Sequence, residues 1–117
     1  MENQIALIIK TDGTKEVTLF TEGHFLELAQ KTVGGWMQLV RLPSKGIDLY
    51  LNEEGKLDQL PQNPVATALW SEDYGLTDFI VGNVIITGGV NSEGETVGLT
   101  EGQLATLFDY NRQIEML

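Results

Sequence analysis

Apolar residues in this chain follow two spacings, one typical of strands and one typical of helices, and the two alternate from segment to segment. Residues 47–52 alternate apolar and polar side chains, which is the pattern of a half-buried antiparallel strand. In the segment 25–33, apolar residues instead recur at helical spacing. Such interspersed patterns predict an α+β fold, with helices packed on a small sheet.

Strand signals occur in five places, at 5–9, 16–21, 36–42, 47–52 and 78–87. Asp12-Gly13 lies between the first two strands, which therefore read as a β-hairpin. The last segment is the most apolar stretch of the chain and is expected to be a central strand. Gly82-Asn83 predicts a bulge or bend within it.

Helix boundaries are marked by short polar and glycine motifs. Thr21 is the expected cap of a first helix that ends at Gly34-Gly35. Asn63-Pro64 starts a second helix that fades by Gly75. After a polar loop from Gly88 to Gly98, the segment 100–103 forms a capping box for a third helix. The apolar stripe of that helix is expected to comprise Leu104, Leu107, Phe108 and Ile114.

These segments predict a small, mainly antiparallel sheet of about five strands with three helices, in the order β-β-α-β-β-α-β-α. The 117 residues are expected to form a single domain, 1–117. Because the chain has no cysteine, it has no disulfide, no thiol nucleophile and no cysteine-based metal site. Its start lacks a signal-peptide pattern and its apolar runs are too short to span a bilayer. We therefore expect a cytoplasmic protein, with no membrane partner.

The formal charge of −10 lies entirely in one part of the chain. Residues 1–45 hold five acids and five bases, whereas residues 46–117 hold twelve acids and two bases, Lys56 and Arg112. Such a surface repels phosphate backbones, so direct nucleic-acid binding is disfavoured. A basic protein partner would be attracted. The alternative is that the acidity serves only solubility.

Catalytic and cofactor motifs are weak. The only histidine, His24, lies at the start of the first helix, where a neutral general base is conceivable but the sequence favours a solvent-exposed structural residue. The glycine-rich segment 88–94 lacks the Lys-Ser/Thr pair of a phosphate-binding loop. The acidic group Asp48, Asn52, Glu53, Glu54 and Asp58 has oxygen ligands but not the spacing of an EF-hand. No catalytic residue, metal or cofactor is therefore predicted.

Several phrases of the chain resemble one family. They are 33–36 (VGGW), 51–57 (LNEEGKL), 60–67 (LPQNPVAT), 80–84 (IVGNV) and 94–100 (GETVGLT). Together they are similar to the DUF3846 family, a domain of unknown function. The resemblance implies a small protein of phages, plasmids and other mobile elements, and it transfers no activity and no site residues.

The leading hypothesis is a phage or mobile-element accessory protein that binds and inhibits a host protein, such as a defence or DNA-handling protein. Its expected partner-binding residues are acids and tyrosines of the acidic part: Asp48, Tyr50, Glu53, Glu54, Asp58, Glu72, Asp73 and Tyr74. Tyr110 is a further candidate for an interface.

A second hypothesis is a sponge for a small nucleotide-type defence signal, held in a pocket between subunits of a homo-oligomer. Trp36 or Tyr50 would stack on the base, and Arg41, Lys45 and the amides near Gly34-Gly35 would bind phosphate. A small enzyme of unknown type is the third hypothesis.

Overall fold

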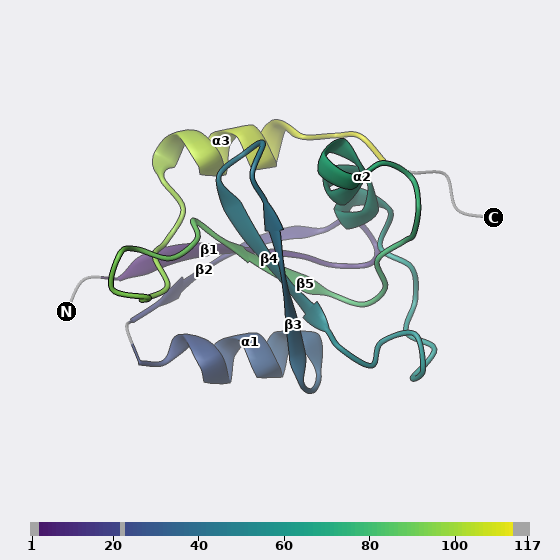
Figure 1. The fold of residues 1–117 in the computed structure, drawn as a ribbon, viewed down its shortest axis with the longest axis horizontal. Helices are drawn as coiled ribbons and strands as arrows, with labels where there is room; N and C mark the ends of the chain where they lie inside the picture. The colour runs from purple at the N-terminus through teal and green to yellow at the C-terminus, as the bar shows by residue number, and fades with distance from the viewer. Residues whose placement is uncertain (1–2, 22, 114–117) are drawn as a thin grey trace.

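The computed structural model describes residues 3–21 and 23–113, and it has one sheet between two layers of helix (Figure 1). The strands are β1 (Gln4–Ile9), β2 (Lys15–Phe20), β3 (Met37–Leu42), β4 (Ile47–Asn52) and β5 (Val84–Thr87). The helices are α1 (Phe25–Val33), α2 (Pro64–Tyr74) and α3 (Glu101–Asp109). The α+β class and the order β-β-α-β-β-α-β-α are confirmed. In the described part of the chain, no helix is long and apolar enough to cross a bilayer.

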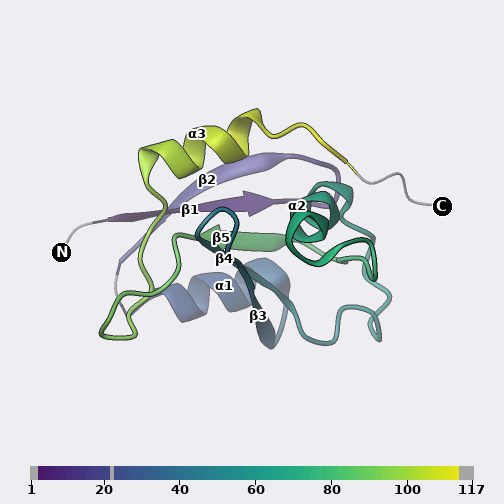
Figure 2. The same ribbon diagram turned by 45° about the horizontal axis from the view of Figure 1, so that its top comes forward.

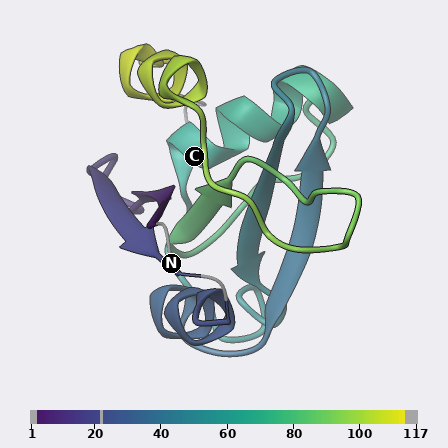
Figure 3. The same ribbon diagram turned by 90° about the vertical axis from the view of Figure 1, so that its left-hand side faces the viewer.

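All neighbouring strands are antiparallel, in the spatial order β2-β1-β5-β4-β3. The last strand in sequence is therefore the central one, and it joins the β1–β2 hairpin to the β3–β4 hairpin (Figure 3). β2 and β3 are the two edges. The sheet twists strongly, so that β1 runs across the view of Figure 1 while β3 runs steeply through it.

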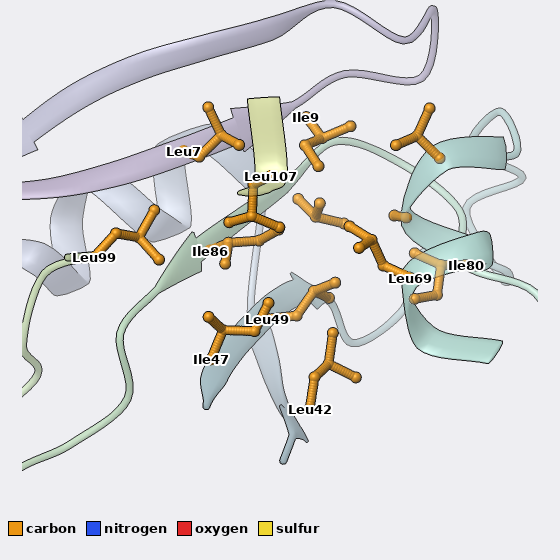
Figure 4. Packing of buried hydrophobic residues seen from close by; sticks show 13 residues of the cluster. Leu7, Ile9, Leu42, Ile47, Leu49, Leu69, Ile80, Ile86, Leu99 and Leu107 are labelled. Carbon is orange, nitrogen blue, oxygen red and sulfur yellow. The ribbon is translucent and has the colours of Figure 1, made fainter. Parts of the chain in front are cut away.

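Each face of the sheet has its own apolar core. The larger core lies between the sheet and the helices α2 and α3, and Figure 4 shows the side chains that meet there. The smaller core lies between the sheet and α1, and it includes Ala6, Ile8 and Ile85 from the strands with Phe25 and Ala29 from the helix. Figure 2 shows α3 lying along β2 and β1, with α1 on the other side of the sheet. Because β1 and β5 are covered on both faces, their sequences read as continuous apolar runs rather than alternating ones.

Most helix boundaries follow the local signals. The side chain of Asn63 accepts a hydrogen bond from the Ala66 N–H at 3.1 Å, and the capping box of α3 is formed. Gly34 ends α1 in the left-handed conformation. The expected cap of α1 was wrong, because the N-cap is His24 and makes no side-chain capping bond. Thr21 instead hydrogen-bonds the His24 ring nitrogen Nδ1 at 2.9 Å.

β5 is shorter than the predicted segment 78–87 because the chain bends before Val84. Gly82 has a φ of 81°, which only glycine adopts at little cost. The preceding Val81 makes an isolated bridge to Gln62 that is not part of the sheet. The bend at Gly82-Asn83 is thus confirmed, but it separates the strand from the residues before it.

Backbone hydrogen bonds hold the segment 88–98 against the rest of the fold. The Gly88 N–H donates to the Val97 carbonyl at 2.9 Å, and the Leu99 N–H donates to the Ile5 carbonyl at 2.8 Å. A side chain at Gly88 would come within 2.3 Å of the Gly98 carbonyl oxygen, so this turn requires glycine. The segment therefore holds a defined position above the end of β5.

Candidate functional site

A groove of about 280 Å³ opens beside the edge strand β3, on the face of the sheet that carries α2. Its apolar lining comes from four parts of the chain: the β3–β4 hairpin, the turn that follows β4, α2, and the segment that leads into β5. We call it the β3 groove, and its apolar residues are Val40, Leu51, Leu57, Trp70, Phe79, Ile80 and Val81. Concave surfaces with aromatic walls are typical binding sites.

The rim of the β3 groove is acidic. Glu53 and Asp78 line it, and Glu54 and Asp58 lie in the adjoining exposed turn. The only nearby base is Lys56, whose ammonium pairs with Asp78 and lies 4.7 Å from the centre of the Phe79 ring. Donation by Lys56 lowers the pKa of the Asp78 carboxyl, so Asp78 is charged at neutral pH. With four acids and one base, the rim keeps a net charge of −3.

Large apolar side chains are exposed around this groove. Leu57 is 83% exposed and Phe79 is 40% exposed, although both line the β3 groove. At the start of β3, Trp36 is 71% exposed. Exposed aromatic and aliphatic side chains gathered around one hollow are typical of a protein-binding surface, because a partner that covers them removes apolar area from water.

Three of the predicted partner-binding residues have a structural role at the C-terminal end of α2. Glu72 pairs with the Lys45 ammonium at 2.7 Å. Asp73 accepts hydrogen bonds from the N–H and hydroxyl of Ser44, at 3.1 and 3.0 Å. Tyr74 donates its hydroxyl proton to the Arg41 carbonyl. Together, Glu72, Asp73 and Tyr74 tie α2 to β3 and the β3–β4 turn, and we call them the α2 latch.

Tyr110 is part of the same structural network. Its hydroxyl donates to Glu72 at 2.5 Å. Burial and the neighbouring Glu72 carboxylate raise the pKa of Tyr110 well above its usual value. Donation from Lys45 and Tyr110 lowers the pKa of Glu72.

Two other predicted partner-binding residues are buried, on the opposite face of the sheet. Asp48 is 4% exposed and Tyr50 is 7% exposed. Both point to the α1 side because they alternate with the core residue Leu49. The eight predicted residues therefore do not form one surface: only Glu53, Glu54 and Asp58 are exposed at the β3 groove.

Tyr50 forms part of a second hollow, of about 320 Å³, between α1 and the segment 88–98. We call it the α1 cleft, and it is lined by Phe20, Gly23, Phe25, Leu26, Met37, Tyr50, Glu95 and Thr96. The Tyr50 ring meets the Phe25 ring edge-on, with centroids 4.9 Å apart. Burial raises the pKa of the Tyr50 hydroxyl, and hydrogen bonding with Thr96 opposes that rise.

Asp48 lies beside Tyr50 on the same face of β4. Its oxygen Oδ2 is buried and has no hydrogen-bond partner among the described residues. Burial raises the pKa of the Asp48 carboxyl, and the positive charge of Arg41 on the neighbouring strand opposes this. This carboxyl is the most poorly satisfied polar group that the structure describes.

Three of the residues expected to bind a nucleotide are not brought together. Trp36 and Arg41 stand near opposite ends of β3. Lys45 is engaged by Glu72, and its ammonium lies 5.7 Å from the centre of the Tyr110 ring. A phosphate at Lys45 would have to displace the Glu72 carboxylate.

The geometry of the described residues gives little support for a metal site or for an acid–base catalytic pair. Over residues 3–21 and 23–113, no three His, Cys, Asp or Glu side chains are grouped so as to hold a metal ion. Asp48 and Glu53, both members of the acidic group considered for a metal, lie at opposite ends of β4. His24 is exposed and bonded to Thr21, away from the buried Asp48.

Sequence reasoning missed the groove residues Trp70, Phe79 and Leu57. Trp70 lies in the expected second helix and Phe79 in the expected strand 78–87, and aromatic residues in such segments usually pack inside. The signal that points to Phe79 is local: it follows Thr77 and Asp78, two polar residues in the break after Gly75. Only the folded chain places these residues beside the edge strand.

A family model described as a domain of unknown function, DUF3846, matches residues 2–113. No curated protein and no solved structure is significantly similar to the chain. The matched range covers all of the strands and helices described above. The chain therefore belongs to the DUF3846 family.

Proposed function

We propose that this protein acts by binding a basic, partly apolar segment of another protein in the β3 groove. The observation that carries the proposal is the apolar β3 groove with its acidic rim, beside a free strand edge. The partner in this proposal is a host protein, such as a defence or DNA-handling protein. The setting is the phage or mobile element that the family resemblance implies.

The charge balance of the molecule supports a basic partner. Three lysines are already paired with acids within the fold: Lys10 with Glu16, Lys45 with Glu72 and Lys56 with Asp78. The exposed acids Glu53 and Glu54 thus face solvent without compensation. Proteins that grip nucleic acid carry basic segments, which such a surface attracts over roughly 8 Å at physiological salt.

The test compares two double charge reversals with the same net change. One is Glu53→Lys/Glu54→Lys at the rim of the β3 groove, and the matched control is Glu93→Lys/Asp109→Lys at exposed sites elsewhere. Each protein is tagged and incubated with host lysate at low salt, and bound proteins are quantified by mass spectrometry. A host protein recovered by the wild type and the control, but lost from the groove variant, is the expected result.

Two outcomes would contradict the proposal. Equal loss from both variants would assign binding to overall charge rather than to the β3 groove. Full recovery by the groove variant would place the interface elsewhere on the molecule.

A second candidate function is binding of a small molecule in the α1 cleft. The observation that favours it is the combination of aromatic walls with the nearby Asp48, two residues before Tyr50 on β4, whose buried Oδ2 has no hydrogen-bond partner among the described residues. Because the acidic Glu95 lines the cleft, we expect an uncharged or cationic ring rather than a phosphate. A defence signal with a nucleobase would have to present its base, not its phosphates, to this cleft.

Filling the α1 cleft tests this candidate. Leu26 is exposed at its border, so Leu26→Trp should block the cleft without disturbing the core. A nucleoside that raises the thermal midpoint of the wild type should then leave the variant unchanged. If nucleobases, nucleosides and nucleotides all fail to shift the wild type, this candidate is wrong.

A further inference from the structure

We propose that the partner segment binds as an added strand on the free edge of β3, extending the sheet. This inference rests on the groove function proposed above and specifies its geometry. β3 has β4 as its only strand neighbour, so one side of its backbone faces away from the sheet. Addition of an extended peptide to such an edge gives affinity through main-chain hydrogen bonds and specificity through alternate side chains.

The hydrogen-bond phase of the β3–β4 ladder shows which groups face outward. The Glu53 N–H donates to the Trp36 carbonyl at 2.9 Å, so this pair marks a hydrogen-bonded position. In the observed register, Gln38 pairs with Leu51 and Val40 with Leu49. Because hydrogen-bonded positions alternate in an antiparallel ladder, Gln38 and Val40 face β4. The N–H and carbonyl groups of the intervening residues, Met37, Leu39 and Arg41, therefore face outward.

Tyr74 supplies an independent check of this phase. Its hydroxyl donates to the Arg41 carbonyl, which must therefore point away from β4. The α2 latch thus covers the end of the edge nearest the β3–β4 turn. The backbone groups of Met37 and Leu39 have no hydrogen-bond partner among the described residues and remain open. We call these four groups the β3 edge.

The residues of the β3 groove determine which side chains the added strand should carry. Val40 and Gln38 line the groove, so alternate side chains of a strand beside them would reach Trp70 and Phe79. These positions fit apolar residues. The end of the strand near Trp36 would meet the acidic rim at Glu53, which fits lysine or arginine.

A second copy of this chain is the less favourable occupant. Pairing two β3 edges would bring the two acidic rims together, and each chain carries a net charge of −10. Like charges facing each other across an interface cost free energy. The partner is therefore a different protein with a basic, extended segment.

The first part of the test identifies a probe and scans its backbone. A displayed library of random twelve-residue peptides is selected against the full chain at low salt. The strongest binder is then synthesised with a single N-methyl group at each position in turn. N-methylation removes one N–H donor and hinders pairing on that side only, so affinity should fall at every second residue. Each such loss should be at least about tenfold, as for a lost hydrogen bond with its steric clash.

The second part changes the protein. Leu39→Pro removes one outward donor, and proline is tolerated on an edge strand when the N–H faces solvent. Leu39→Pro should lower the affinity for the peptide at least about tenfold relative to Leu39→Ala, which keeps the N–H donor. Thermal unfolding of both variants establishes that they are folded. Because the N-methyl scan uses the unaltered protein, the test does not depend on the fold of the proline variant.

The outcomes separate this inference from the proposed function. Selected peptides that lose affinity with Glu53→Lys/Glu54→Lys but show no two-residue pattern of N-methyl losses would overturn strand addition and leave groove binding intact. A library that yields no binder dependent on the acidic rim would overturn both.

Discussion

At the scale of single residues, Asp48 is the least favourable group in the fold. Its carboxyl is 4% exposed and one oxygen has no partner among the residues that the structure describes. Burial raises its pKa, so the folded state holds the proton more tightly than the unfolded state. A raised carboxyl pKa lowers stability as pH rises through it. This cost is absent below the unfolded pKa and complete above the folded pKa.

We therefore expect Asp48→Asn to stabilise the protein at pH 7 by about 1 kcal/mol, because the amide has the same shape without the charge. The gain should disappear near pH 3, below the ordinary carboxyl value of 3.8. Urea unfolding of both proteins across this range measures the difference. Asp58→Asn is the control, since Asp58 is exposed and its substitution should change stability by less than about 0.5 kcal/mol. A destabilised Asp48→Asn would mean that the carboxylate has a favourable role in the folded chain.

At the scale of elements, Asn63 does more than begin a helix. Its oxygen caps α2, and its amide nitrogen donates to the Ile9 carbonyl at 3.1 Å and the Gly82 carbonyl at 2.9 Å. One fully buried side chain thus joins the end of β1, the start of α2 and the bend before β5. Capping alone would accept aspartate equally well, whereas the two donated bonds require an amide.

Asn63→Asp should therefore cost about 3 kcal/mol or more, since two buried carbonyls lose their donor and face a carboxylate. The matched control is Thr100→Asp at the exposed cap of α3, where the change should stay within about 0.5 kcal/mol. Urea midpoints of the two variants give the comparison. A small cost at Asn63 would show that water or a backbone shift replaces the lost donors.

The edge strand offers a prediction that involves no substitution. Amide protons of Gln38 and Val40 face β4 and should be protected from exchange, whereas those of Met37 and Leu39 face outward and should exchange quickly. Hydrogen exchange followed by NMR reads each amide separately. Uniform protection along β3 would mean that its outer side is covered, for example by self-association.

At the scale of the whole molecule, the excess of negative charge lowers the stability of the fold but favours binding of a basic partner. A net charge of −10 on a compact chain produces self-repulsion, which salt screens. The local ion pairs are mostly exposed and contribute little.

Raising sodium chloride from about 20 mM to about 500 mM should therefore increase the free energy of unfolding at pH 7, by about 1 kcal/mol. The same increase in salt should weaken the binding of a basic partner, because this binding depends on attraction by the acidic side chains, which salt screens. Urea titrations at both salt concentrations test the first effect. A fall in stability with salt would mean that the local pairs outweigh the overall repulsion.

The class of the fold and most element boundaries could be derived from the chain because their causes are local. Apolar spacing, the Asn63-Pro64 start and the Thr100–Gln103 capping box each act over a few residues. The exceptions also have local causes that compete with one another. Thr21 bonds to the His24 ring instead of the helix amides, and Gly82 bends the apolar run that was expected to be one long strand.

The groove and the free edge depend on pairings between distant segments, which no local pattern specifies. Whether β3 is an edge is decided by β5 inserting between β1 and β4, and whether Phe79 is exposed is decided by the path after α2. Alternation correctly placed Asp48 and Tyr50 opposite Leu49, but it could not tell that α1 and the segment 88–98 would cover that side. Local chemistry thus determined which elements form, and only long-range packing decided which surfaces remain open to a partner.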